Sequence, residues 1–581
     1  MLKSSGLDNP KYRALIVLMV AAVAIIFYQI TYYCALYIHD DIMNYCFAVS
    51  GKTQSYAEAV ATSQGRIMFY PLTYLAHLPF WANDLLVYKM ISYASISFSA
   101  LALGILVYRH VDKALGFVSV LLFFALAQVS NQHNLFCSYV LTHQVPIGIL
   151  LLSFERQLEF YKTRRTRTMV VSALLLTLCS MLYEAFILFA LLTFLIGVAI
   201  HISKKDKNIL RLFLDLKFHI VFMAAYLVVY FIWRVLHPSA YDGNVVSLIS
   251  LSATLQALFT YSFGLSPLRT FLSLPPGTDY IGFFDIIFVI KGLLAAACLA
   301  LVLRAVERFP LRRLLAICAL CLVGMLLPNL LLSVTQRRVE WVLNNGISEY
   351  VTTFYSYFFL IIIITCLLGF LYTRIRFKKT FLAVAMAAVV SVSVMTDIAN
   401  AWYAATQENQ LRRMMAVTAA AEEGMFNDIE ENSIIYLPDY VGIHLDMNNM
   451  SWFSVIYTLH VFTFTNKAED LKFDVPTYIA RYDADSHAFW FARIDADYRT
   501  DEITFVADEG FNNHDLLIPT DSPESIAVLN DTETAEIAEA VEAADEAAAV
   551  RIDQPETREI HVTGDNIHVD RVDVSLYADA A

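Results

Sequence analysis

Long apolar runs separated by short polar segments dominate the first 396 residues of the chain. A helix needs about 20 mostly apolar residues to cross the hydrocarbon core of a membrane. The pattern therefore predicts an all-α, polytopic membrane protein with about eleven transmembrane helices. The predicted spans are 14–38, 84–108, 114–130, 139–159, 169–183, 185–202, 217–236, 281–303, 314–334, 350–372 and 380–396.

The stretch 169–202 is one apolar block with basic residues on both sides, Lys162 to Arg167 before it and Lys204 to Lys207 after it. Lysine and arginine accumulate in cytoplasmic loops, so both flanks are expected inside the cell. The block must then form a hairpin that turns near Tyr183 and Glu184. The other spans alternate consistently with this choice, which predicts a cytoplasmic N-terminus and an extracytoplasmic C-terminal region.

Polar and β-rich sequence begins where the last span ends, and it predicts two further regions. Residues 397–517 begin with an amphipathic stretch and contain short β-rich runs, as in a small extracytoplasmic α+β domain. Residues 518–581 are acidic and rich in alanine, which is typical of a disordered tail. The loop 39–83 contains amphipathic stretches that predict helices on the membrane surface.

Composition agrees with membrane insertion and excludes several other classes. Of the 581 residues, 58% are apolar and 16% are charged, and the mean hydropathy is +0.55. A water-soluble chain is nearer one quarter charged. The net charge of -13 arises from residues 397–581, which hold 37 of the 54 acidic and 10 of the 41 basic residues. No basic soluble patch is available for nucleic acid, and the eight cysteines form no zinc or disulfide pattern.

The first candidate for chemistry is His39-Asp40-Asp41, at the outer end of the first span. Two adjacent carboxylates at a membrane boundary repel each other and are costly to hold. One of them can act as a general base while the other orients it. The alternative interpretation is a polar helix end without further function.

Arginines on the predicted outer face are the second candidate. Arg66 follows a glycine in the first outer loop, and Arg337 and Arg338 lie together before the tenth span. The guanidinium fork suits a phosphate or a carboxylate, although an interfacial arginine can also contact lipid headgroups. Tyr183 and Glu184 are a third candidate, because an acid inside an apolar block marks a functional site or a polar turn.

An Asp-Asp pair after the first span, followed by Gly65-Arg66, resembles the GT-C superfamily of membrane glycosyltransferases, and most closely bacterial enzymes of the O-antigen glucosyltransferase type. The resemblance covers most of residues 1–396. It implies that Asp40 or Asp41, preferably Asp40, is the catalytic base. It implies further that Arg66, Arg337 and Arg338 bind the donor phosphate, and that Glu184, His39 and Tyr183 contact the acceptor or the sugar.

The function implied is an inverting glycosyltransferase on the outer face of a bacterial plasma membrane. The donor is a polyprenyl-phosphate-linked sugar, and the acceptor is an envelope glycan, lipid or protein. No WWDYG-like motif is found, which argues against an oligosaccharyltransferase, and Asp-Asp in place of Asp-Glu argues against a protein O-mannosyltransferase. No cofactor is expected, although a divalent metal stays open. The alternatives are a polymerase or ligase that uses polyprenyl-diphosphate glycans, and a transporter or flippase for lipid-linked sugars.

Overall fold

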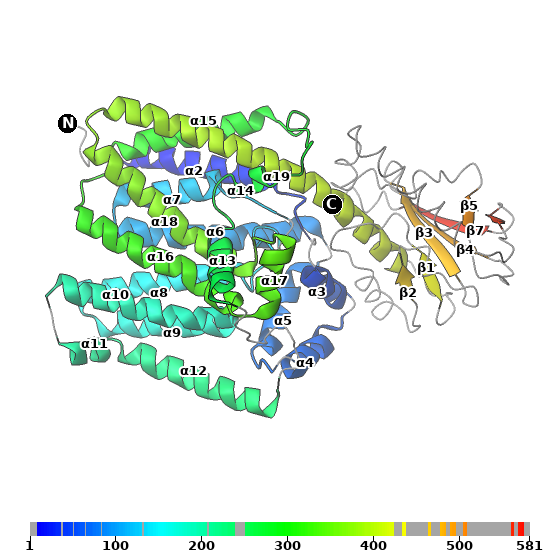
Figure 1. Cartoon of the computed structure of the whole chain (residues 1–581), viewed down its shortest axis with the longest axis horizontal. Helices are drawn as coiled ribbons and strands as arrows, with labels where there is room; N and C mark the ends of the chain where they lie inside the picture. The colour runs from blue at the N-terminus through cyan, green and yellow to red at the C-terminus, as the bar shows by residue number, and fades with distance from the viewer. Residues whose placement is uncertain are drawn as a thin grey trace.

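The computed structural model consists mainly of a helical bundle, and a small set of strands follows it near the C-terminus (Figure 1). The described residues are 9–35, 39–49, 51–63, 65–82, 84–130, 133–205, 208–238, 250–422 and seven strands, given below with their bounds.

Eight helices of the described residues are long and apolar enough to cross a membrane. These are α2 (Pro10–Ile30), α6 (Leu85–His110), η2 (Glu184–Leu188) with α10 (Phe189–Ser203), α12 (Lys217–Leu236), α15 (Ile286–Leu303), α16 (Leu311–Ser333), α18 (Val351–Arg374) and the first part of α19 (Lys378–Glu422). The prediction of a polytopic, helical membrane protein is confirmed at this level.

Three further helices correspond to the remaining predicted spans: α7 (Lys113–Ala125), α8 (Gln144–Thr163) and α9 (Thr166–Leu182). α7 and α9 are apolar but shorter than a full span, and α8 carries charged residues in its second half. Each of the eleven predicted runs therefore contains a helix. The predicted hairpin is also found, because α9 ends at Leu182, Tyr183 is extended, and η2 and α10 lead back.

Glycines allow the central helices to pack closely. A Cβ atom on Gly104 of α6 would lie 2.5 Å from the Val120 side chain of α7, and one on Gly116 would lie 2.6 Å from Tyr108. A Cβ on Gly148 of α8 would overlap Phe98 and Ser99 of α6. Small residues at such positions bring helix backbones together, which is how helices associate in a membrane without a hydrophobic driving force.

The predicted cytoplasmic loops gather at one end of the bundle, which we call the basic end. Arg313 donates to the His110 carbonyl at 2.6 Å, Lys162 donates to the Arg109 carbonyl at 2.8 Å, and Arg308 donates to the Thr373 carbonyl at 3.2 Å. The short helix α11 (Ile209–Asp215) lies at this end too (Figure 1). The alternation of spans is thus consistent, whereas the face of the membrane to which this end belongs stays a prediction.

The opposite end, which we call the cavity end, carries short helices. They are α3 (His39–Val49), α4 (Thr53–Ser63), α5 (Phe69–His77), η1 (Leu78–Phe80), α13 (Leu251–Ser262), α14 (Arg269–Leu272) and α17 (Gln336–Asn345). The first four form the predicted helical loop between α2 and α6, and in Figure 1 they lie at the end of the bundle nearest the strands.

α19 continues for 45 residues through the predicted boundary at residue 396 and leads to the strands. One sheet has the order β2-β1-β3-β4-β7, from Thr463–Thr465, Ile434–Tyr436, Thr477–Asp483, Ala488–Ile494 and Ile567–Asp573. β1 is parallel to β2 and β3, and the pairs β3–β4 and β4–β7 are antiparallel. β5 (Thr504–Ala507) pairs with β6 (Glu559–Val562) in parallel.

The strands β6 and β7 fall inside residues 518–581, which the composition predicted to be a disordered tail. At these positions the structure differs from the expectation. The sequence of β7, Ile567-His-Val-Asp-Arg-Val-Asp573, alternates apolar and polar residues as a strand does. This local pattern outweighs the acidic composition of the region. The rest of the predicted tail lies outside the described residues.

Candidate functional site

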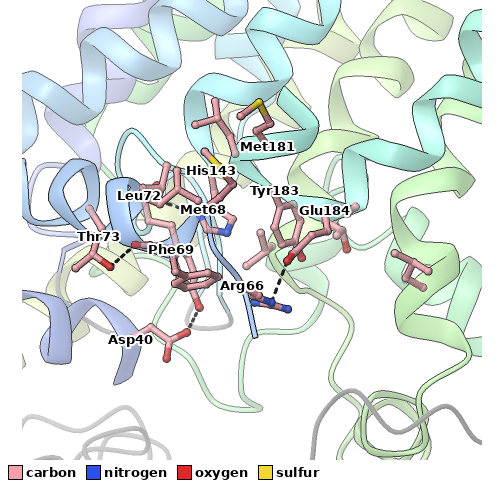
Figure 2. A pocket seen from close by; sticks show the side chains of 18 of the residues that line it. Asp40, Arg66, Met68, Phe69, Leu72, Thr73, His143, Met181, Tyr183 and Glu184 are labelled. Carbon is pink, nitrogen blue, oxygen red and sulfur yellow. Dashed lines mark hydrogen bonds and ion pairs between the residues drawn. The ribbon is translucent and has the colours of Figure 1, made fainter. Parts of the chain in front are cut away.

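A cavity of about 400 Å³ opens at the cavity end of the bundle, between the short helices and the ends of the long ones. Its walls come from α3, α5, the turn between α9 and η2, and α12, α16 and α18, together with the segment before α8. Five of the eight candidate residues line it: Asp40, Arg66, Tyr183, Glu184 and Arg338. Figure 2 shows Asp40 on one side of the cavity and the facing side chains of Arg66 and Glu184 on another.

The two adjacent aspartates occupy different environments. Asp40 lies in the first turn of α3 and lines the cavity, and its Oδ2 accepts a hydrogen bond of 2.5 Å from the Tyr139 hydroxyl. Asp41 is 1% exposed, and both of its oxygens accept the Tyr139 backbone N–H at 3.1 and 3.2 Å. Burial raises the pKa of Asp41 to about 7. Only Asp40 can therefore meet a ligand.

A buried lysine fixes the entry to α3. Lys89 of α6 is fully buried, and its ammonium donates to the carbonyl oxygens of Thr31 and Cys34 at 3.2 and 2.5 Å. These carbonyls follow the end of α2, where the helix leaves its last oxygens without partners and a cation is favourable. Lys89 thereby ends the first span and sets the position from which the chain starts toward Asp40.

The segment before α8 has an unusual backbone. His133, Tyr139 and Leu141 have φ angles of 33°, 51° and 64°, in the left-handed region that residues with a side chain rarely adopt. Such conformations cost about 1–3 kcal/mol each and concentrate at functional sites. Here the conformation turns both the N–H of Tyr139 and its hydroxyl toward the aspartates, so one residue holds the whole pair.

Arg66 and Glu184 form an ion pair in the cavity, with 3.0 Å between Nε and Oε1. Both side chains are about one fifth exposed, and the guanidinium also lies 5.2 Å from the centre of the Phe69 ring. Gly65 has a φ of +63°, and a Cβ atom there would overlap the His237 carbonyl oxygen. The glycine before Arg66 is thus required by its backbone conformation and by close packing against the end of α12. We expected Glu184 to bind the acceptor or the sugar. In the structure its carboxylate contacts Arg66 and so helps to orient the guanidinium.

Arg338 enters the cavity from α17. It is 6% exposed, its Nη2 donates to the Tyr350 hydroxyl at 2.9 Å, and its guanidinium lies 4.0 Å from the centre of the Trp341 ring. The neighbouring Arg337 is exposed and does not line the cavity. Consecutive helix residues point about 100° apart, and although both guanidinium groups lie against the Trp341 ring, at 5.4 and 4.0 Å from its centre, only that of Arg338 lines the cavity. For Arg337, the expected role at the donor phosphate is not supported.

Several cavity residues were not singled out from the sequence. Tyr139 lies inside a predicted span, where a tyrosine gives no signal. Arg234 also lines the cavity, from the last turn of α12, and an arginine near the end of an apolar run could have been noticed. The side chain of His39 lies outside the described residues, so its expected role is not placed.

Glu349 is a buried acid just behind the cavity. It accepts hydrogen bonds from the Ser130 hydroxyl and, at 3.2 Å, from the Asn134 amide. Burial raises its pKa to about 7. Since Tyr350 follows it and binds Arg338, Glu349 connects the segment that holds the aspartates to the residues that hold the arginine.

A possible metal-ligand group lies elsewhere, at the basic end. Among the described residues, His110, Glu155 and Glu159 place ligand atoms within 4.8 Å of one another. Glu155 already accepts from Arg109 at 2.8 Å and from Arg156. Two guanidinium groups supply the positive charge that a cation would bring, so this cluster is interpreted as an ion-pair network.

The charges and surfaces of the cavity suit an amphipathic anion. Three arginines (Arg66, Arg234 and Arg338) meet two carboxylates (Asp40 and Glu184) in its wall. Another part of the wall is apolar and comes from Met181, Leu182, Pro328, Leu331 and Leu332. A ligand with a phosphate and a hydrocarbon chain fits both parts.

No family model matches this chain, and no curated protein matches it. The resemblance to the GT-C superfamily accordingly stays an expectation from the motifs and the span pattern of residues 1–396. The functional interpretation therefore depends on the geometry and the charges of the cavity.

Proposed function

We propose that the protein is an inverting glycosyltransferase of the GT-C type. In this proposal it moves a sugar from a polyprenyl-phosphate donor to a cell-envelope glycan, lipid or protein acceptor on the outer face of a bacterial plasma membrane. The observation that carries the proposal is the single cavity in which a carboxylate, Asp40, lies together with Arg66 and Arg338. An acid–base group and fixed positive charge are the two things this reaction needs.

The roles follow from the chemistry of the displacement. Asp40 takes the proton of the acceptor hydroxyl as the acceptor oxygen forms a bond to the anomeric carbon. The bond from that carbon to the phosphate oxygen breaks, and the electron pair stays on the phosphate. Arg66 and Arg338 then stabilise the charge that develops on the leaving phosphate. Attack from the face opposite the phosphate inverts the anomeric centre.

The apolar wall supports a lipid-linked donor. Leu331 and Leu332 of α16 and Met181 and Leu182 of α9 line the cavity, and Leu331 is 43% exposed. In this proposal the hydrocarbon chain of a lipid substrate lies along these side chains. The sequence has no Gly-rich phosphate loop of the kind that binds nucleotides, which also favours a lipid phosphate over a nucleotide sugar.

The extracytoplasmic location of the cavity end and of the strands after α19 belongs to the same proposal. It follows from the basic residues at the opposite end and the positive-inside rule. A domain on that side built from the strands after α19, β7 included, would be in a position to contact a large acceptor.

The test is sugar transfer by membranes that contain the full chain. Radiolabelled polyprenyl-phosphate sugars are supplied one at a time, with cell-envelope extract as acceptor and membranes lacking the protein as control. We expect transfer from one of these donors, with release of polyprenyl phosphate in equal amount and inversion at the anomeric carbon.

Two results would replace the proposal. Transfer from polyprenyl-diphosphate glycans alone would identify a polymerase or ligase. Movement of labelled lipid-linked sugar across the membrane of reconstituted vesicles, without transfer to an acceptor, would identify a transporter or flippase.

A further inference from the structure

A chain of hydrogen bonds leads from Asp40 through Tyr139 to His133. The Tyr139 hydroxyl donates to Oδ2 of Asp40 at 2.5 Å, and Nδ1 of His133 lies 3.0 Å from the same hydroxyl oxygen. The first distance is short for a hydrogen bond between two oxygens, and the second is within the usual range. The tyrosine hydroxyl therefore bridges a carboxylate and an imidazole.

The chain leads out of the cavity. Asp40 and Tyr139 line the cavity, whereas His133 does not. His133 is partly exposed, and its ring centre lies 5.0 Å from that of Tyr350 and 6.2 Å from that of Trp341. These ring contacts fix the position of the imidazole next to the Tyr139 hydroxyl.

The backbone is strained at both ends of the segment from His133 to Tyr139. His133 and Tyr139 each have a positive φ, and neither is a glycine. Ordinary packing does not require a bulky residue in the left-handed region. The strained conformations are explained if they serve to bring the Tyr139 hydroxyl within hydrogen-bond distance of the His133 imidazole.

The inference rests on the proposed function. A transferase must keep water away from a reactive donor, since water would compete with the acceptor. When the donor and the acceptor fill the cavity, the proton that Asp40 receives needs another exit. Imidazole is the side chain whose ordinary pKa allows it to accept and release a proton near neutral pH.

We propose that Tyr139 and His133 form a proton relay that carries the acceptor proton from Asp40 out of the filled cavity. Protonated Asp40 gives its proton to the Tyr139 oxygen while the Tyr139 hydroxyl proton moves to Nδ1 of His133. The products are the Asp40 carboxylate, a neutral tyrosine and an imidazolium, so charge and protons balance. The imidazolium then releases its other proton, from Nε2, to water.

In the structure the tyrosine hydroxyl donates to the carboxylate, as in the state after the transfer. In that state an imidazole protonated on Nδ1 would donate to the tyrosine oxygen, which lies 3.0 Å away. Before the transfer the hydroxyl points the other way, toward an imidazole that carries its proton on Nε2. Rotation of one hydroxyl and a change of imidazole tautomer through solvent therefore reset the relay.

The test is the transfer rate of His133→Ala at fixed pH, with and without added imidazole, in membranes that hold the full chain. We expect kcat to fall about tenfold or more while KM for the donor is unchanged, and imidazole to restore most of the lost rate. Methylimidazoles of different basicity should restore it in proportion to their basicity. Tyr139→Phe should lower kcat too, and imidazole should not restore it, because the link to Asp40 is missing.

Tyr93→Phe is the matched control, since it removes a hydroxyl that donates to the Tyr28 carbonyl at 2.7 Å, away from the cavity. It should leave the rate unchanged. Suppose that the wild type transfers sugar. If His133→Ala is then equally active, or if it loses activity that added imidazole does not restore, the relay alone is overturned. A wild type that transfers from no monophosphate donor overturns the proposed function, and the relay with it.

Discussion

Asp40 and Asp41 are neighbours in the chain, but their side chains point to different sides of α3. Asp40 reaches the cavity, and Asp41 lies behind it against the backbone of Tyr139. The sequence indicated the pair but could not divide the roles between its members, because the division depends on which face of α3 is covered. The preference for Asp40 as the base agrees with its place in the cavity.

The buried Asp41 predicts a dependence of stability on pH. Burial raises its pKa to about 7, whereas an aspartate in an unfolded chain titrates near 4. At this group the folded state binds more protons between about pH 4 and 7, so the contribution of Asp41 to the free energy of unfolding should fall as the pH rises through that range and level off above it. Asp41→Asn should make thermal unfolding in detergent less dependent on pH over this range, by an amount on the order of 1–4 kcal/mol.

The exposed Glu58 of α4 offers a matched control for this measurement. Glu58→Gln should leave the pH profile unchanged, while Glu349→Gln should flatten it as Asp41→Asn does, since burial raises the pKa of Glu349 in the same way. Asp41→Asn and Glu349→Gln proteins whose free energy of unfolding keeps the wild-type dependence on pH between about 4.5 and 7 would contradict this description of both carboxyl groups.

Helix α17 directs the side chains of two adjacent arginines to different surroundings. In the sequence, Arg337 and Arg338 are equivalent, and both were assigned to the donor phosphate. In the structure, the turn of the helix directs Arg338 into the cavity and Arg337 to the surface. A run of adjacent basic residues does not reveal the phase of a helix unless its buried face is known.

The two arginines provide a matched pair for mutation. Arg338→Ala should lower kcat/KM for a polyprenyl-phosphate donor about 10- to 100-fold, because one charge-assisted hydrogen bond is worth about 1.5–3 kcal/mol. Arg337→Ala should change it less than about twofold, since such a surface change leaves the cavity intact. Initial rates over a range of donor concentrations measure both. Equal losses of kcat/KM in the two variants would contradict the assignment of Arg338 to the donor phosphate.

Arg338→Lys separates charge from geometry. A lysine keeps the positive charge but not the planar fork or its stacking on Trp341. We expect an activity between those of the wild type and of Arg338→Ala, with unfolding temperature measured alongside to exclude loss of the helix.

The elements themselves were largely predictable, since each span is an apolar run and each turn between spans is polar or basic. Their limits were less so. The first run continues to residue 38, but α2 ends at Ile30, because Lys89 from another helix binds the carbonyls that follow. A contact between segments so far apart in the sequence cannot be read from local hydropathy.

At the scale of the whole molecule, the structure brings residues from eight segments of the chain to one cavity. The sequence indicated Asp40, Arg66, Tyr183, Glu184 and Arg338 separately, and the fold places them together. Tyr139, which lines the cavity, and Glu349, which lies behind it, gave no sequence signal, because one lies in an apolar run and the other is a single acid before a span. The order of charges along the bundle, basic at one end and mixed at the other, agrees with the predicted orientation.

The most direct test of the proposed function compares sugar transfer by the wild type with that of Asp40→Asn and Glu58→Gln. Asp40→Asn keeps the shape of the side chain and its ability to accept a hydrogen bond from Tyr139, but removes the base, which typically contributes about 10²–10⁴-fold to a rate. Glu58→Gln alters an exposed acid on α4, outside the cavity. At equal amounts of protein, transfer from the polyprenyl-phosphate donor should fall by that factor in Asp40→Asn and stay unchanged in Glu58→Gln. An Asp40→Asn protein that transfers sugar at the wild-type rate would contradict the assignment of this cavity as the site of transfer.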